Sequence, residues 1–191
     1  MKTILRRVPV ILPALAVVGI AASAAGAAGQ VADAHHASAA RHAVSGLDVE
    51  WLKTSAQGDV FEIRGGHIAL QKSSNSAVKA LAQRLIKDHT KSLRDAEKLA
   101  AKHGIKLEKT PTPSQQWELS MVSSLSGKTF DTAYSSLEVG DHHQDISETT
   151  DEERMGFNRE VVKDAKKEIP MLRMHLHLSK VALASAQAEA G

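Results

Sequence analysis

The chain has 191 residues, of which 42% are hydrophobic and 3% aromatic, and it contains no cysteine. The missing cysteines exclude disulfides, thiolate metal sites and the cysteine-linked lipid of bacterial lipoproteins. The formal net charge is only +2, and no basic stripe runs along the chain, so we expect no nucleic-acid partner.

Residues 1–24 have the three parts of a secretory signal peptide. Lys2, Arg6 and Arg7 precede an apolar run over residues 8–22, and small residues follow it. The apolar run is shorter than the about 20 residues that span a bilayer. We therefore expect export to the periplasm with no stable membrane insertion, and an uncleaved membrane anchor is the alternative.

A flexible leader is expected over residues 25–46, which are rich in Ala, Gly, Ser and His. Solvated histidines are common in such linkers. In a weaker hypothesis, His35, His36 and His42 make the leader a metal buffer.

Residues 47–187 are predicted to form one all-α domain. Good helix formers dominate, and apolar residues recur with a period of 3.6 in four long segments. The long helices are expected at about 48–71, 76–103, 129–150 and 159–186, with a short extra helix near 114–125. Two short turns and one long connection predict a ferritin-like four-helix bundle, in which the second and third long helices run parallel. A simple up-down bundle is the alternative.

Two details of these helices bear on the site. On the first long helix, an apolar stripe passes through Leu52, Ala56 and Val60, which places Glu62 at its flank and His67 nearer its centre. In the fourth, Pro170 removes one backbone donor and predicts a kink.

Polar residues fall on or beside the inward stripes of all four helices. In an antiparallel pair, residues equidistant from the turn lie at similar height, so Glu62 should lie level with His89, and His142 with His175. Counting from the helix starts puts Asp141 at the height of His89. These positions are therefore expected to meet in one layer.

Carboxylate and imidazole groups in one layer suit a divalent transition metal such as iron, zinc or manganese. The candidate ligands are Glu62, His89, Asp141, His142 and His175. Alternative ligands, or groups that orient a ligand from behind, are Asp88, His67 and Glu168. The competing interpretation is a buried polar network that holds no metal.

Other cofactors and catalytic sites have little support. A haem between His89 and His175 would lack both a C-x-x-C-H motif and aromatic lining. The helices carry no Glu-x-x-His, so a ferroxidase-type centre is not expected. No G-x-S-x-G or phosphate loop occurs, and no catalytic residue is assigned.

Four stretches, taken in order, carry a family resemblance: SAQGDVFEIRGGHIALQKSSNSAVKALAQRLIKDHTK, LSGKTFDTAY, DHHQD and IPMLRMHL. Together they resemble the bacterial domain-of-unknown-function family 4142, whose members are often labelled exported or outer-membrane proteins with a ferritin-like bundle. The resemblance covers about residues 48–183. It implies recurrent polar positions at Glu62, Asp88, His89, Asp141, His142 and His175.

One stretch departs from the family pattern. After the Asp-His pair the chain reads QDISETT, with Glu148 and Thr149 where the family usually has apolar residues. The end of the third long helix is therefore expected to be looser or more solvated.

Two functions follow from these observations. The first is a non-enzymatic role in the cell envelope, structural or stress-related, with an unknown protein partner or none. The alternative is a divalent-metal-binding protein that uses the interior layer of Glu, Asp and His.

Overall fold

The computed structural model describes residues 43–188, which form five helices. The helices are α2 (Gly46–Lys72), α3 (Ser76–Lys102), α4 (Pro113–Ser123), α5 (Gly127–Met155) and α6 (Arg159–Ala188). The expected signal peptide and most of the expected leader lie outside the described residues. The last expected leader residue, Gly46, is the first residue of α2, because Ser45 caps that helix.

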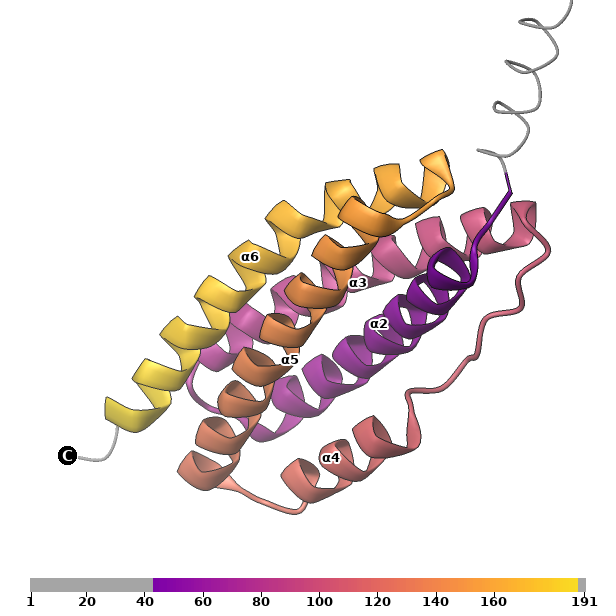
Figure 1. The fold of residues 1–191 in the computed structure, drawn as a ribbon. Coiled ribbons are helices and arrows are strands. Elements are labelled where there is room, and N and C mark those ends of the chain that lie inside the picture. The colour runs from indigo at the N-terminus through magenta and orange to yellow at the C-terminus, as the bar shows by residue number, and fades with distance from the viewer. Residues whose placement is uncertain (1–42, 189–191) are drawn as a thin grey trace, which may run out of the picture. The chain divides into compact units, whose positions relative to one another are not determined.

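The four long helices form the bundle that the sequence predicts (Figure 1). Trp51 near the start of α2 donates from Nε1 to Thr149 near the end of α5, at 3.3 Å. Asn75 before α3 bonds Ser185 near the end of α6, at 3.0 Å. These contacts make α2 antiparallel to α5 and α3 antiparallel to α6. Since α5 and α6 form a hairpin, α3 and α5 run parallel, as predicted.

The α4 helix lies in the long connection and flanks α2 and α5. Thr112 caps α4 by accepting from the backbone N–H of Gln115. Gln57 of α2 donates to the carbonyl of Thr110, at 3.1 Å, and ties the connection to the bundle.

The end of α5 is partly solvated, as expected at Glu148, but it is not loose. The helix continues to Met155 instead of loosening near residue 150. The reason is Thr149, which is buried and accepts the indole N–H of Trp51, while Glu148 faces outward. The polar departure from the family pattern is thus accommodated by a polar partner.

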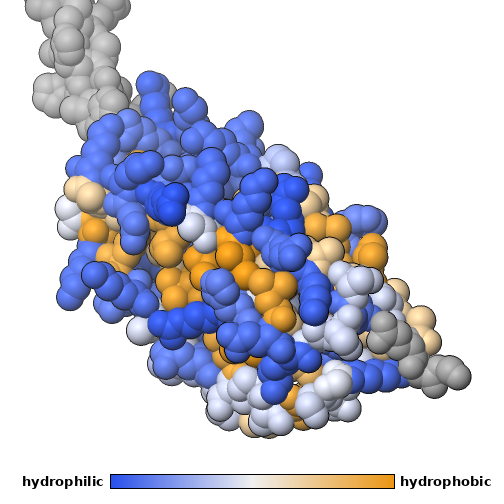
Figure 2. All heavy atoms as spheres, turned by 180° about the vertical axis from the view of Figure 1, so that it is seen from behind, coloured by the Kyte–Doolittle hydropathy of each residue, from blue (hydrophilic) through white to orange (hydrophobic). Residues whose placement is uncertain are grey.

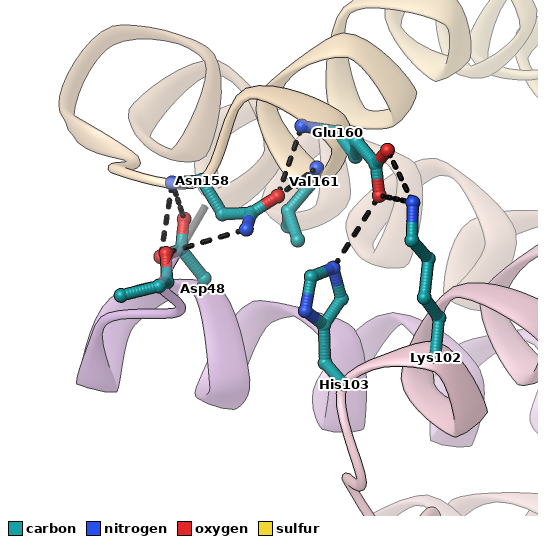
Figure 3. A network of polar contacts seen from close by, with 7 residues as sticks. Asp48, Lys102, His103, Asn158, Glu160 and Val161 are labelled. Atoms are coloured by element: carbon teal, nitrogen blue, oxygen red, sulfur yellow. Dashed lines mark hydrogen bonds and ion pairs between the residues drawn. The ribbon is translucent and has the colours of Figure 1, made fainter. Parts of the chain in front are cut away.

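Polar contacts hold both hairpins together at one end of the bundle (Figure 3). Asp48 accepts the backbone N–H groups of Phe157 and Asn158, at 2.9 and 3.1 Å. Asn158 caps α6 by accepting the backbone N–H groups of Glu160 and Val161. Beside them, Lys102 at the end of α3 pairs with Glu160 at the start of α6.

The helix α6 continues unbroken through Pro170. The sequence correctly placed this proline in the helix interior. The helix accommodates it without ending, so the proline does not divide α6 into two elements.

The core consists of two apolar clusters with a polar layer between them. One cluster gathers around Leu81, Leu85, Phe130 and Tyr134. The other gathers around residues that include Trp51 and Val161. Between them on every long helix lie buried polar residues: Asp59, Glu62, His89, Glu138, His142 and His175. This layer is the only part of the described core in which imidazole and carboxylate groups of all four long helices come together.

Figure 2 shows the face opposite that of Figure 1, on which an apolar patch is surrounded by hydrophilic residues. Among the described residues, no helix combines the length and the apolar character that crossing a membrane requires.

Candidate metal centre

Three histidines from three helices meet in the polar layer. His89 of α3 is 2% exposed, and His142 of α5 and His175 of α6 are fully buried. Their ring centroids lie 5.0 to 5.9 Å apart. One ring nitrogen from each lies within 4.8 Å of the other two. We call these three residues the histidine trio.

One nitrogen of His89 is held by a carboxylate. Nδ1 of His89 lies 2.8 Å from Oδ1 of Asp59, a residue of α2 that is 3% exposed. Burial raises the pKa of Asp59 well above its usual value. When Asp59 is ionised, its carboxylate only accepts hydrogen bonds, so Nδ1 of His89 carries the proton and donates it. The lone pair of His89 is then on Nε2, which has no hydrogen-bond partner among the described residues.

The other two histidines repeat this arrangement. Nδ1 of His142 donates to the backbone carbonyl of Glu138, at 2.9 Å. Nε2 of His175 donates to Asp88 Oδ2, at 3.0 Å. The opposite nitrogens, Nε2 of His142 and Nδ1 of His175, are buried and have no partner among the described residues. Each ring is thus fixed through one nitrogen and presents the other as a free acceptor.

Asp88 is itself held in place. It accepts from Arg84 one turn earlier on α3 as well as from His175. Burial opposes its ionisation, but the bonds from Arg84 and His175 outweigh burial and hold the pKa of Asp88 below its usual value. Asp88 is therefore a carboxylate near neutral pH and keeps the proton of His175 on Nε2.

The trio is neutral near pH 7. Burial lowers the pKa of His89 to about 4 and that of His175 to about 4. Burial, with the charge that His89 and His175 would carry, lowers the pKa of His142 to about 3. Neutral imidazole is the form that binds metals. Three buried imidazole nitrogens without a hydrogen-bond partner are costly unless a cation, a water molecule or a proton satisfies them.

The structure divides the predicted ligand set into two groups. His89, His142 and His175 form the trio. Glu62 lies on the Nδ1 side of His142, 3.8 Å from that nitrogen, together with Glu138. The half-buried Asp141 interacts electrostatically with Glu62.

The three alternative residues are placed differently. Asp88 orients His175, as described above. Glu168 of α6 accepts from Ser92 at 2.8 Å and does not reach the trio. His67 is exposed, and the expectation that it lies near the centre of the stripe is wrong.

The error at His67 has a simple origin. The buried face of α2 passes from Ala56 to Asp59 and Glu62 and then to Gly66, whereas Val60 is only half-buried. An apolar-stripe criterion cannot follow a face whose middle is acidic.

Sequence reasoning missed two residues of the layer, Asp59 and Glu138. Asp59 is three residues before Glu62, and Glu138 is four residues before His142, so each shares a helix face with a predicted ligand. This spacing was the available signal.

A cavity of about 20 Å³ lies beside His89 of the trio and is large enough for about one water molecule. His89, Asp59 and Glu168 line it, together with Asp145 of α5. Burial and nearby carboxylates raise the pKa of Asp145 well above its usual value.

A comparison with protein-family models matches residues 33–181 to the domain of unknown function DUF4142. The chain belongs to the DUF4142 family. A comparison with curated proteins found no match.

This DUF4142 chain also resembles a solved structure, a DUF305 fragment from Deinococcus radiodurans. The TM-score is 0.67 at 15% sequence identity, and the alignment covers 74% of the DUF4142 chain and 98% of the other. At this identity the likeness shows a shared helical fold and says nothing of a shared function.

Proposed function

We propose that this DUF4142 protein binds one divalent transition-metal ion through His89, His142 and His175. The observation that supports this most is that one ring nitrogen of each histidine lies within 4.8 Å of the other two. Each ring also has one buried nitrogen without a partner among the described residues, and its opposite nitrogen is tied to a carboxyl group or a carbonyl.

This arrangement has the design of histidine metal sites in general. A metal-bound histidine almost always donates its second ring N–H to a carboxylate or carbonyl, which fixes the tautomer and the ring orientation. Asp59, Asp88 and the carbonyl of Glu138 have that role here. A buried network without metal would instead pair the free nitrogens with donors, and none is present among the described residues.

The donor type narrows the class of ion. Three neutral imidazoles suit zinc, copper, iron or nickel better than manganese, which prefers oxygen. Three protein ligands leave a fourth coordination position for water or another small ligand. We propose that the site binds a metal ion and assign no reaction to it.

We further propose that the protein works in the periplasm after removal of residues 1–24. The basic and apolar pattern of that segment supports export.

An interaction role in the envelope is the second candidate. Trp117 and Met121 lie one turn apart on α4 and are 64% and 50% exposed, an arrangement that favours contact with a protein partner. A crosslinker at position 117 that captures one defined protein in cells would support this role.

Cobalt binding tests the metal proposal. The mature protein, freed of metal, is expected to bind about one equivalent of Co²⁺ with visible absorption bands of a nitrogen-coordinated ion. His175→Ala should abolish the bands. His177→Ala, which changes an exposed histidine on the same helix, should leave them unchanged. Equal spectra for the two variants would contradict the assignment.

A further inference from the structure

A second group of donors lies on the other side of His142. Glu62 of α2 and Glu138 of α5 are both fully buried. One oxygen of each lies within 4.8 Å of the other and of a ring nitrogen of His142. The distances to Nδ1 of His142 are 3.8 Å from Glu62 Oε1 and 3.9 Å from Glu138 Oε2.

These two carboxyl groups have no cation to balance them. None of their four buried oxygens makes a hydrogen bond of standard geometry among the described residues, and the two carboxyl groups lie close enough to share a proton. No lysine or arginine within residues 43–188 forms an ion pair with either group. His142 does not supply the balancing positive charge, because burial keeps it neutral and its Nδ1–H donates to the carbonyl of Glu138.

Two further oxygen groups border the pair. The hydroxyl of Tyr134, which is 1% exposed, is buried beside Glu138 and lies close enough to donate to it. Asp141 adjoins Glu62, and its Oδ2 is likewise buried. The donors around this point are therefore oxygens, in contrast to the nitrogens of the trio.

Asp141 connects the pair to the surface. It lines a groove of about 510 Å³ between α2, α4 and α5. Three more acidic residues line the same groove: Glu118, Asp145 and Glu148. An acidic groove concentrates cations, so it provides an entry route to the buried pair.

We propose that Glu62, Glu138 and Asp141 form a second cation site, which takes a hard divalent ion such as Mn²⁺ through carboxylate oxygens. Such ions prefer carboxylate ligands. The proposal extends the proposed function to a centre of two ions, with the ring of His142 between them. The carboxylate site does not require the trio to be occupied.

Protons and charge balance in this binding step. Without the ion, two buried carboxyl groups so close together cannot both carry a negative charge, so the pair retains at least one proton. Entry of the ion releases the retained protons to solvent, and the carboxylates then carry the negative charge that the ion neutralises.

Manganese binding to the mature protein tests the inference. Electron paramagnetic resonance measures the loss of the free Mn²⁺ signal during titration. We expect about one bound ion, with affinity lowered about 100-fold or more in Glu62→Gln and in Glu138→Gln. Glu50→Gln, which changes an exposed glutamate of α2, is the matched control and should bind as the unmodified protein does.

Thermal unfolding without metal separates lost binding from lost folding. Glu62→Gln replaces one of two facing acids with a neutral isostere, so its unfolding temperature should equal or exceed that of the unmodified protein. If neither the unmodified protein nor Glu62→Gln binds Mn²⁺, and Glu62→Gln is the more stable of the two, then the carboxyl pair holds only protons. That result would overturn the inference. Equal Mn²⁺ affinity in Glu62→Gln and Glu50→Gln would overturn it as well.

The experiments test the two proposed sites independently. If the trio binds no Co²⁺ but Mn²⁺ binding depends on Glu62, the proposed function fails and the carboxylate site stands. If His175→Ala abolishes Co²⁺ binding and no protein binds Mn²⁺, the trio stands and the carboxylate site fails.

Discussion

At the scale of single residues, the site depends on hydrogen bonds that fix ring orientation. Asp88 determines which nitrogen of His175 is free, and Asp59 does the same for His89. Without such a partner a ring can rotate or take the other tautomer, and the free lone pair then leaves the common point.

Asp88→Ala should therefore weaken metal binding although Asp88 is not in the trio. We expect Co²⁺ affinity to fall by about 10–100-fold, the usual cost of losing such a partner. Asp95→Ala is the control, because Asp95 lies on the same helix but pairs with Lys91 and Lys98 near the surface. Competition with a chelator of known affinity measures both variants. Equal affinities would mean that Asp88 does not position the ring.

A second residue-scale prediction concerns Glu152, which is fully buried near the α5–α6 turn. Burial and the adjacent Asp48 raise its pKa from 4.5 to about 8. Between about pH 4.5 and pH 8, the folded state therefore keeps a proton that the unfolded state has lost. The free energy of unfolding falls as pH rises through this window.

Glu152→Gln should remove this loss, because the amide donates to Asp48 at every pH. At pH 8 the variant should be more stable than the unmodified protein, by on the order of 1 kcal/mol, and the difference should vanish near pH 4.5. Urea unfolding at several pH values measures it. Asp151→Asn, an exposed neighbour, should show no such trend, and a parallel pH profile for Glu152→Gln would contradict the account.

At the scale of helices, the sequence predicted the bundle and most helix ends, because period-3.6 patterning and turn residues are local signals. It predicted the height of the layer, since counting residues from a turn needs no side-chain detail. It did not predict which way α2 turns its face, because Asp59 and Glu62 replace apolar residues there. It also did not predict that His89 belongs to the trio and Glu62 to the carboxylate pair, because the orientation of the histidine rings cannot be read from residue spacing.

Close packing of α2 on α3 depends on Gly66. A Cβ at this position would lie 2.7 Å from Cγ1 of Ile86 and 3.1 Å from the carbonyl oxygen of Ala82. Gly66→Ala should therefore destabilise the protein by about 1–3 kcal/mol. In Gly58→Ala, on the same helix, the new methyl group would meet nothing within 4 Å. That variant should gain up to about 1 kcal/mol through helix propensity. Denaturant unfolding of the pair checks the opposite signs, and equal effects would contradict this view of the contact.

At the scale of the whole molecule, the polar layer separates the two apolar clusters of the core. The trio joins α3, α5 and α6, and the carboxylate pair joins α2 and α5. An ion that binds only the folded state stabilises it by about 2.7 kcal/mol when its concentration is 100 times the dissociation constant. Metal should therefore raise the unfolding temperature in proportion to the logarithm of its concentration.

The leader offers a competing location for metal. If the bundle holds the ion, a chain that begins at residue 43 should bind as much metal as one that begins at residue 25, since His35, His36 and His42 are not needed. Isothermal titration with Zn²⁺ compares the two chains. Loss of the tight-binding ion in the shorter chain would place it in the leader.

The most direct measurement is the metal content of the protein purified from the periplasm without a tag, determined by elemental mass spectrometry for three chains. The unmodified protein and His143→Ala, which changes an exposed neighbour of the trio, should each carry about one equivalent of zinc, copper, iron or nickel. His142→Ala should carry none while remaining folded by circular dichroism. Equal metal in His142→Ala and His143→Ala, or no metal in the unmodified protein even after exposure to these ions, would contradict the assignment of the trio as a metal site.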